Sequence, residues 1–255
     1  MDTRKIKAAA QLLLAARNHE ISLERLPDEH VPADVDEAYA IQDEVMQALG
    51  QIGGWKLTAG ALGAQPACAP MPAQCIFAAP YQFFDLATAG TRGVEVELAL
   101  RLKHDLPPRA TAYTRHEVVA AIATVHPAIA MASSRYTESQ AITPLAGLAD
   151  ALSHCALIYG PGRTDLGQIE QGMQHAELYF NGLELELAHD VDDDSEIWTR
   201  LTWLANHLAT RCGGLEAGQF VTLAACASRQ AVATVSSVQA GRAQRGTPVL
   251  AMAQA

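Results

Sequence analysis

The sequence predicts a globular fold that combines helices and strands, because both kinds of hydrophobic periodicity occur along the chain. Helical spacing is clearest toward the C-terminus, where Ile197, Leu201, Leu204 and Leu208 fall on one face. Strand alternation is clearest over residues 94–101, where apolar and polar side chains take turns. With 255 residues, 49% of them hydrophobic and 18% charged, the chain is long enough to bury a full core.

Two helices are expected ahead of that core. The first has an apolar face made of Ile6, Ala9, Leu13 and Leu14, and Gln11 interrupts the apolar run that a signal peptide would need. The second runs over residues 34–49, with Asp34 and Glu37 spaced as a capping box. We therefore expect an N-terminal helical region over residues 1–52 and a core domain over residues 53–255.

The rest of the chain is expected to alternate loops, strands and short helices. Residues 59–80 are rich in Ala, Gly and Pro, which predicts a loop or a cover. A helix is expected over residues 114–125, because Thr114 and Glu117 form a second capping box and Pro127 follows. Further strands are expected over residues 128–134, 220–225 and 231–238.

Two glutamates share one face of the strand at residues 94–101. Successive strand side chains point to opposite faces, so Glu95 and Glu97 lie side by side. Two carboxylates held close need a cation, a proton or solvent, and a metal ion is the functional interpretation. Glu184 and Glu186 repeat the pattern after an Asn-Gly turn, so at least one of the pairs could simply be a solvated sheet face.

Charge and cysteine content narrow the function classes. The formal net charge of −10 argues against a nucleic-acid surface. The five cysteines have no zinc-site spacing and predict reduced thiols in a cytoplasmic protein. Ser153 stands beside His154, but neighbours in sequence do not make a catalytic dyad, and no GxSxG motif occurs. Lys56 is a cation between apolar residues, a pattern that usually belongs to a lysine reaching for solvent.

Short motifs in a fixed order carry a family resemblance. They are Ala38–Gln42, Gly54–Thr58, Val94–Ala99, Asp105–Pro107, His126–Ile129, Ser134–Arg135, Leu148–Asp150 with Ser153, Trp203–Asn206 and Leu215–Gly218. In this order, over nearly the whole chain, they resemble the 2-oxopent-4-enoate hydratase and 4-oxalocrotonate decarboxylase group of the fumarylacetoacetate hydrolase superfamily.

The resemblance implies an α+β fold, built around a large curved mixed β-sheet, or β-roll, with flanking helices, and a homo-oligomer. It implies an enzyme of aromatic catabolism with a Mg²⁺ or Mn²⁺ site whose first ligands are Glu95 and Glu97. It places Glu184 and Glu186 in a hairpin without ligands. A lysine at the position of Lys56 helps to hold or protonate a short 2-oxo or 2-hydroxy acid.

The chain also departs from the family pattern. The third acidic ligand is replaced by Ala130, the usual Pro-Asp pair by Pro72 and Ala73, and a Thr/Ser-Gly step by Leu223 and Ala224. Since Mg²⁺ often uses only one or two protein carboxylates, Glu95 and Glu97 could still hold it. Glu138 and His126 are candidates to compensate for the missing acid.

Three hypotheses follow. The first is a hydratase that converts a 2-hydroxy-2,4-dienoate into a 4-hydroxy-2-oxo acid, with Lys56, Glu95 and Glu97 in the site and Ser153 and Arg135 binding substrate. The second is a decarboxylase of a 2-oxohex-3-enedioate, whose second carboxylate would meet Arg135, Arg92 or Arg101. The third is a divergent relative that is metal-independent, or that lost the chemistry and serves as a partner subunit.

Overall fold

The structure is a computed structural model of the chain. It describes residues 2–19, 21, 23–58, 65–83, 93–137, 142–166, 176–180, 183–185, 194–223, 227–229, 237–242 and 249–253. The helices are α1 (Thr3–Arg17), α2 (Val35–Leu49), α3 (Arg115–Ala120), α4 (Pro144–Ala149) and α6 (Asp194–Arg211), with single 3₁₀ turns η1 (Asp28–His30), η2 (Ala73–Cys75) and η3 (Ala151–Ser153). No helix in this part of the chain is long and apolar enough to cross a bilayer.

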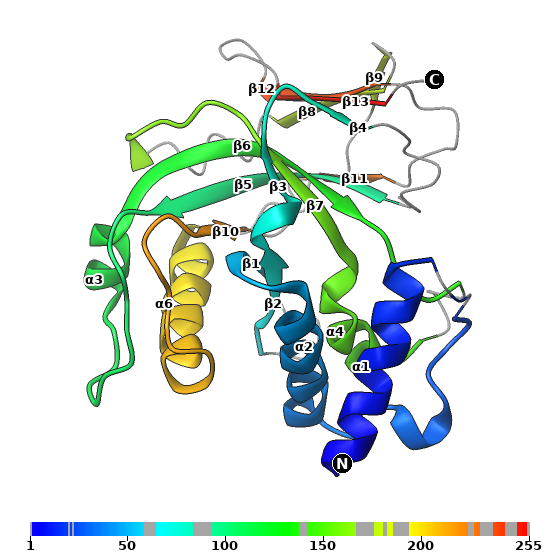
Figure 1. Cartoon of the computed structure of the whole chain (residues 1–255). Helices are drawn as coiled ribbons and strands as arrows, with labels where there is room; N and C mark the ends of the chain where they lie inside the picture. The colour runs from blue at the N-terminus through cyan, green and yellow to red at the C-terminus, as the bar shows by residue number, and fades with distance from the viewer. Residues whose placement is uncertain are drawn as a thin grey trace.

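The strands form two sheets (Figure 1). The larger contains β1 (Ile52–Thr58), β2 (Ala67–Pro72), β3 (Ile76–Ala78), β5 (Gly93–Leu102), β6 (Ile122–Ala132), β7 (His154–Tyr159), β10 (Phe220–Thr222) and β11 (Ala227–Arg229). The smaller contains β4 (Tyr81–Phe83), β8 (Ala176–Phe180), β9 (Leu183–Leu185), β12 (Ser237–Arg242) and β13 (Val249–Ala253).

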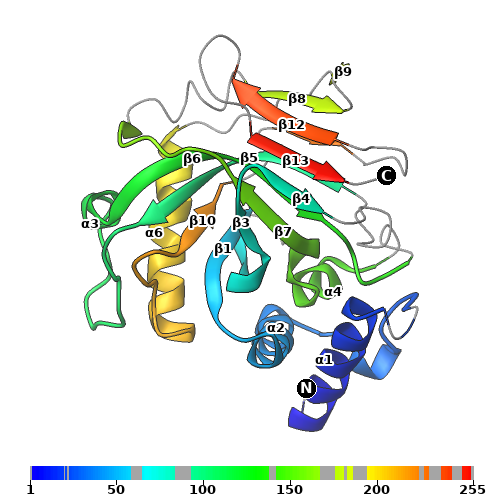
Figure 2. The same cartoon turned by 45° about the horizontal axis from the view of Figure 1, so that its top comes forward.

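The larger sheet is mixed, curved and open. Its order is β2-β1-β10-β5-β6-β7-β3, with β11 pairing β5. The β1–β10 and β3–β7 pairs are parallel, and the other pairs are antiparallel. The smaller sheet lies across β5, β6 and β7, on the other side from α2 and α6 (Figures 1 and 2). This architecture confirms the predicted α+β class.

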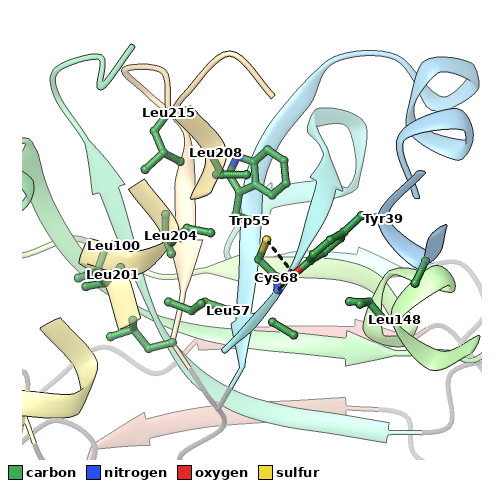
Figure 3. Close-up of a cluster of buried hydrophobic side chains, with 14 of the residues drawn as sticks. Tyr39, Trp55, Leu57, Cys68, Leu100, Leu148, Leu201, Leu204, Leu208 and Leu215 are labelled. Carbon is green, nitrogen blue, oxygen red and sulfur yellow. Dashed lines mark hydrogen bonds between the residues drawn. The ribbon is translucent and has the colours of Figure 1, made fainter. Parts of the chain in front are cut away.

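The main core lies between the larger sheet and the helices. Trp55 and Leu57 of β1 point toward α6 and α2, where they meet the helical leucines (Figure 3). The face of α6 predicted from spacing is confirmed: Ile197, Leu201, Leu204 and Leu208 are buried in this core. Tyr39 of α2 extends to β2, where its hydroxyl accepts a hydrogen bond from the backbone N–H of Cys68.

The predicted caps of two helices are present. Asp34 caps α2 by accepting a hydrogen bond from the N–H of Glu37 at 2.9 Å, while the carboxylate of Glu37 accepts from the N–H of Ala33. Thr114 and Glu117 form the complete reciprocal capping box of α3. Both sites show that a short polar spacing fixes where a helix begins.

The predicted extent of the helix over residues 114–125 is wrong. α3 ends at Ala120, and β6 starts at Ile122 and carries Pro127 inside it, opposite Leu98 of β5. The capping box specifies a helix start but not its length, and the β-branched residues Ile122, Thr124 and Val125 favour a strand. Pairing with β5 therefore decides the conformation.

The expected loop over residues 59–80 is also partly wrong. Residues 59–64 lie outside the described part, but Ala67–Pro72 is the edge strand β2, paired with β1. Its two prolines count against a strand in a prediction from sequence, because proline within a sheet is tolerated mainly in edge strands. In the C-terminal region, β10 covers only the start of the strand expected over residues 220–225, and β12 starts at Ser237, inside the strand expected over residues 231–238.

Candidate active site

Lys56, Glu95 and Glu97 come together on one face of the larger sheet. Lys56 lies on β1 and the two glutamates on β5, with β10 between these strands. Lys56 Nζ is 2.5 Å from Oε2 of Glu95 and 4.0 Å from Oε1 of Glu97. The predicted metal-binding pair and the predicted substrate-binding lysine therefore form a single ionic cluster. We call this surface of the sheet the site face.

The register of the strands defines the site face. Residues that pair directly across neighbouring strands project to the same side. Glu95 pairs with Ala130 of β6, Glu97 pairs with Ala128, and Lys56 pairs with Thr222 of β10. Trp55 and Leu57, the neighbours of Lys56, project to the helix side instead. This alternation explains why a lysine stands between two apolar residues in the sequence.

Glu97 is buried, and both of its carboxylate oxygens are buried without a hydrogen-bond partner in the described part of the chain. Burial raises its pKa to about 8; the ammonium of Lys56 opposes this shift and the carboxylate of Glu95 adds to it. The hydroxyl of Thr222 is also buried; it is near enough to Glu97 to lower the pKa of that carboxyl, but it makes no hydrogen bond of ordinary geometry in the described part of the chain. Unpaired buried oxygens of this kind are what an incoming cation or ligand would satisfy.

Lys56 is held as an ammonium. Burial by itself lowers its pKa, but the carboxylates of Glu97 and Glu95 outweigh burial and hold the pKa above the ordinary value. With Glu95 and Glu97 both ionised, the cluster carries one negative charge in excess. The site therefore favours a further positive charge, either a proton or a metal ion.

The donor set fits a divalent cation held by two carboxylates. Glu95 and Glu97 offer hard oxygen ligands, and the unpaired oxygens of Glu97 are available to one. The position across from Glu95 is filled by the methyl group of Ala130, which is 2% exposed and packs in an apolar cluster. Accordingly, the described residues contain no group of three His, Cys, Asp or Glu side chains placed to hold a metal. Water and substrate would have to complete the coordination.

Apolar side chains cover much of the rest of the site face. Met71, Ala99, Ala128, Ala130, Leu157 and Phe220 form a buried cluster of their own, separate from the main core. Ala128 and Ala130 of this cluster pair with Glu97 and Glu95 across β5 and β6, so the cluster lies directly beside the two glutamates. Such surroundings exclude water and strengthen the electrostatic interactions inside the site.

An aromatic group closes one end of the site face. His126, Tyr159 and Phe220 contact one another, with ring centroids 4.5–5.5 Å apart, and Arg101 lies over Phe220. His126 Nδ1 donates to the carbonyl of Gly160, so Nε2 accepts from the Thr124 hydroxyl. Burial lowers the pKa of His126. Both ring nitrogens are thus engaged, which leaves His126 no free donor atom for a metal.

Arg135 is not brought to the cluster. Its guanidinium pairs with the carboxylate of Asp150 and donates to the carbonyl of His154 at 2.9 Å, and its side chain is buried. It lines a pocket that also contains Pro70 and Pro72 of β2, on the helix side. A role for Arg135 in binding substrate remains a prediction, and it would require this pair to open.

Ser153 lies in an unusual turn. Ala151, Leu152 and Ser153 have φ values of 51°, 52° and 59°, three consecutive left-handed residues without a glycine. Left-handed backbone costs roughly 1–2 kcal/mol per residue, so the surrounding contacts must hold it. The carbonyl of Ser153 accepts a hydrogen bond from the N–H of Ser133 at 2.8 Å. The predicted contact of Ser153 with substrate remains a prediction.

Several predicted residues lie elsewhere. Glu184 is on β9 of the smaller sheet, in the hairpin with β8, and so lies on a different sheet from Glu95 and Glu97. Arg92, Glu138, Glu186 and Ala224 lie outside the described residues. Thr222 was not recognised from the sequence, although a threonine inside the apolar run 220–223 is a signal that could have marked it.

Comparison with solved structures identifies the fold. The 4-oxalocrotonate decarboxylase of Pseudomonas putida G7, solved with calcium and acetate, superposes with a TM-score of 0.78 at 18% identity over 100% of this chain and 99% of the other. The same enzyme solved with magnesium and adipate gives 0.78 at 19% identity, with the same coverage. A putative fumarylacetoacetate isomerase/hydrolase of Oleispira antarctica also superposes, with a TM-score of 0.53 at 13% identity over 79% of this chain and 93% of that one. The chain has the fumarylacetoacetate hydrolase fold.

Another solved structure shares part of the fold. The 2-hydroxyhepta-2,4-diene-1,7-dioate isomerase of Mycobacterium marinum matches with a TM-score of 0.53 at 16% identity, over 79% of this chain and 75% of that one. No family model matches the sequence, and no curated protein matches it either. The predicted fold is therefore confirmed by three-dimensional similarity rather than by sequence similarity.

Proposed function

We propose that this protein is a lyase that hydrates a 2-hydroxy-2,4-dienoate of the 2-oxopent-4-enoate type to a 4-hydroxy-2-oxo acid. The observation that carries the proposal is the cluster of Lys56, Glu95 and Glu97 on the site face of this fold, in which Lys56 and Glu97 are buried and Glu95 is partly exposed. The relatives in the comparison are a decarboxylase and an isomerase of short unsaturated acids, which supports the same substrate class.

Glu95 and Glu97 would hold a Mg²⁺ or Mn²⁺ ion. A bound divalent ion polarises a 2-oxo or 2-hydroxy group and stabilises enolate charge. The relatives solved with calcium and magnesium support a metal-assisted reaction.

The side chains of the protein would bind the substrate, deliver a proton and exclude water. Lys56 Nζ, held protonated by Glu95 and Glu97, binds the substrate carboxylate and can deliver a proton at the site face. The wall formed by Ala99, Ala128 and Ala130 excludes bulk water and accommodates the unsaturated carbons. This wall favours a substrate with one carboxylate, because the arginine described on this face, Arg101, lies beyond it over Phe220.

The test is turnover of 2-hydroxypenta-2,4-dienoate with Mg²⁺ or Mn²⁺, followed by product analysis. We expect 4-hydroxy-2-oxopentanoate from the native chain and loss of turnover in Glu97→Gln. Glu184→Gln is the matched control, since it removes the same charge from the second Glu-x-Glu pair. Absence of turnover on every short dienoate with either metal would refute the proposal.

Decarboxylation of 2-oxohex-3-enedioate is the second candidate. It is favoured by the match over the whole chain to 4-oxalocrotonate decarboxylase. The same cluster would serve, because loss of carbon dioxide also develops enolate charge, which a divalent ion held by Glu95 and Glu97 would stabilise. Release of carbon dioxide and formation of a monocarboxylic product would establish it. Turnover that a chelator leaves unchanged would instead assign metal-independent chemistry.

A further inference from the structure

His154, the first residue of β7, is buried, and its Nε2 has no hydrogen-bond partner in the described part of the chain. Buried polar atoms are normally paired, so an unpaired one needs an explanation. The hydroxyl of Thr58 and both carboxylate oxygens of Glu97 are in the same condition. Thr58 lies two residues after Lys56 on β1 and so shares its face of the sheet. Unpaired polar atoms therefore gather on the site face.

A β-bulge turns His154 toward the site face. Ala132 of β6 pairs with His154, whereas the preceding Met131 pairs with Ala156, so β7 has one extra residue at this point. Without the extra residue, the imidazole would project to the helix side, as Ala156 does. Ala132 lies two residues after Ala130, so both face the same way. Because paired residues project to the same side, His154 joins them on the site face.

The curvature of the larger sheet brings His154 back toward Lys56. Three strands, β10, β5 and β6, separate β1 from β7 in the order of the sheet. The turn η3, which ends at Ser153, nevertheless packs against β2, and Ala69 of β2 pairs directly with Lys56. The charge of Lys56 accordingly acts on the His154 ring and lowers its pKa. The two side chains border the site face from opposite sides.

The main chain around His154 is held firmly. Its carbonyl accepts hydrogen bonds from Nη2 of Arg17 at 3.0 Å and from Nη1 of Arg135 at 2.9 Å. The three left-handed residues Ala151–Ser153 come immediately before it. Backbone strain of this kind persists where the surrounding contacts hold it, and it is concentrated at binding and catalytic sites. The imidazole is therefore placed by a rigid, strained turn.

The His154 ring is neutral and stands in a positive field. Burial lowers its pKa well below the ordinary value, and the charges of Lys56, Arg17 and Arg135 lower it further. A neutral imidazole still carries one N–H group that can donate a hydrogen bond. Because the charges that act on the ring are positive, an anionic oxygen is the partner that this position favours.

The neighbours of the ring are small, and Lys56 has donors to spare. Ala132 pairs with His154, and Gly93 pairs with Ala132, so this row of the sheet presents only a methyl group and a hydrogen beside the imidazole. Both neighbours are partly exposed, so solvent reaches the row. The ammonium of Lys56 has three N–H groups, and among the residues that the structure describes only Glu95 accepts a hydrogen bond from it.

We propose that His154 binds the carboxylate of the substrate together with Lys56. Nε2–H of His154 donates to one carboxylate oxygen, and the ammonium of Lys56 donates to the other. The inference rests on the function proposed above, because it concerns the acid that the Lys56 cluster holds. It adds a residue that selects an acid over its neutral analogue. Arg135 keeps its pair with Asp150.

The native chain allows a test that needs no turnover. In protein labelled with ¹³C and ¹⁵N, Nε2 of His154 is assigned through its own backbone amide. The probe is crotonate, a short unsaturated acid, in the presence of Mg²⁺. We expect crotonate to shift this resonance saturably and crotonamide, which has the same shape without the charge, to bind about tenfold more weakly or worse. Absence of a saturable shift, or equal binding of crotonamide, would overturn the proposal.

Variants assign the binding to the N–H group. We expect His154→Leu to weaken crotonate binding by about tenfold or more, and His154→Gln, which keeps an N–H group, to stay within about threefold of the native chain. The matched control is His207→Leu. His207 lies on α6, against Tyr39 and Trp203, and its Nε2 is also buried without a hydrogen bond to the described residues. Native affinity in His154→Leu, or equal losses in His154→Leu and His154→Gln, would refute the proposal.

Kinetics separate this inference from the proposed function. With 2-hydroxypenta-2,4-dienoate and Mg²⁺, His154→Leu should raise KM by about tenfold and change kcat by less than about threefold, because substrate and transition state share the contact. Native turnover with an unchanged KM in His154→Leu would refute the role of His154 and leave the proposed function standing. If crotonate binding depends on His154 but the native chain turns over no dienoate, the proposed function fails and the acid-binding role of His154 stands.

Discussion

Replacing Ala130 by aspartate is expected to rebuild a three-carboxylate metal site. Ala130 pairs directly with Glu95 across β5 and β6, so the Cβ atoms are roughly 5 Å apart. In the absence of metal, a third carboxylate repels Glu95 by about 3 kcal/mol at that separation and an effective dielectric constant near 20. The residue is 2% exposed, so solvent relieves little of this repulsion.

A bound cation attracts both carboxylates, and this attraction outweighs their mutual repulsion. We expect Ala130→Asp to have a lower melting temperature than the native chain when stripped of metal, and to gain more from added Mn²⁺ than the native chain does. By calorimetry, its affinity for Mn²⁺ should exceed that of the native chain by about tenfold or more, as expected for a gain of about 1.4 kcal/mol or more.

The matched control is Ala130→Asn, which has the same shape without the charge. Both variants should be titrated with Mn²⁺ in the presence and absence of oxalate, a stand-in for the chelating end of a 2-oxo acid. Equal Mn²⁺ affinities of Ala130→Asp and Ala130→Asn would show that position 130 does not face the metal. The absence of Mn²⁺ binding in all three proteins would show that Glu95 and Glu97 do not form a metal site.

Three further predictions follow from the charges. The pKa of Glu97 is raised to about 8 in the folded state, so the folded protein binds more protons than the unfolded chain between about pH 4.5 and pH 8. Stability should therefore fall as pH rises through that window. In Glu97→Gln, the denaturant concentration at the unfolding midpoint should depend less on pH. Lys56→Met removes the cation from two carboxylates and should lower the melting temperature more at pH 8 than at pH 6; an equal loss at both would contradict the assigned pairing. Arg135→Met leaves Asp150 buried without its cation and should cost about 3–5 kcal/mol in urea denaturation without weakening Mn²⁺ binding. Loss of Mn²⁺ binding in that variant would connect Arg135 to the site face after all.

Periodicity and caps predicted those elements whose signal is local. The buried face of α6, the start of α2 and the start of α3 follow from residues a few positions apart, and all are present. The end of α3 and the strand β2 depend on pairing with distant strands, which no local pattern contains. Tertiary pairing overrides propensity at both places.

The candidate site also has a part that local sequence predicts and a part that depends on the fold. Alternation along β5 is enough to place Glu95 and Glu97 on one face, but nothing in the sequence joins them to Lys56, which lies two strands away. Family resemblance supplied that connection. It also drew attention to Arg135, whose partner Asp150 becomes visible only when the turn between α4 and β7 is folded. A motif therefore does not by itself tell which partner each of its charged residues meets in the folded chain.

Pro70 and Pro72 affect whether a strand of another molecule can pair with the edge of the larger sheet. β2 forms one end of the larger sheet, and prolines two residues apart remove donors from the same side of a strand. In edge strands that side faces outward, so the border of this sheet offers carbonyl groups without alternating N–H groups. A strand of another molecule would find no ladder to continue there. Addition of a strand from another molecule, in function or in aggregation, is therefore disfavoured at this border.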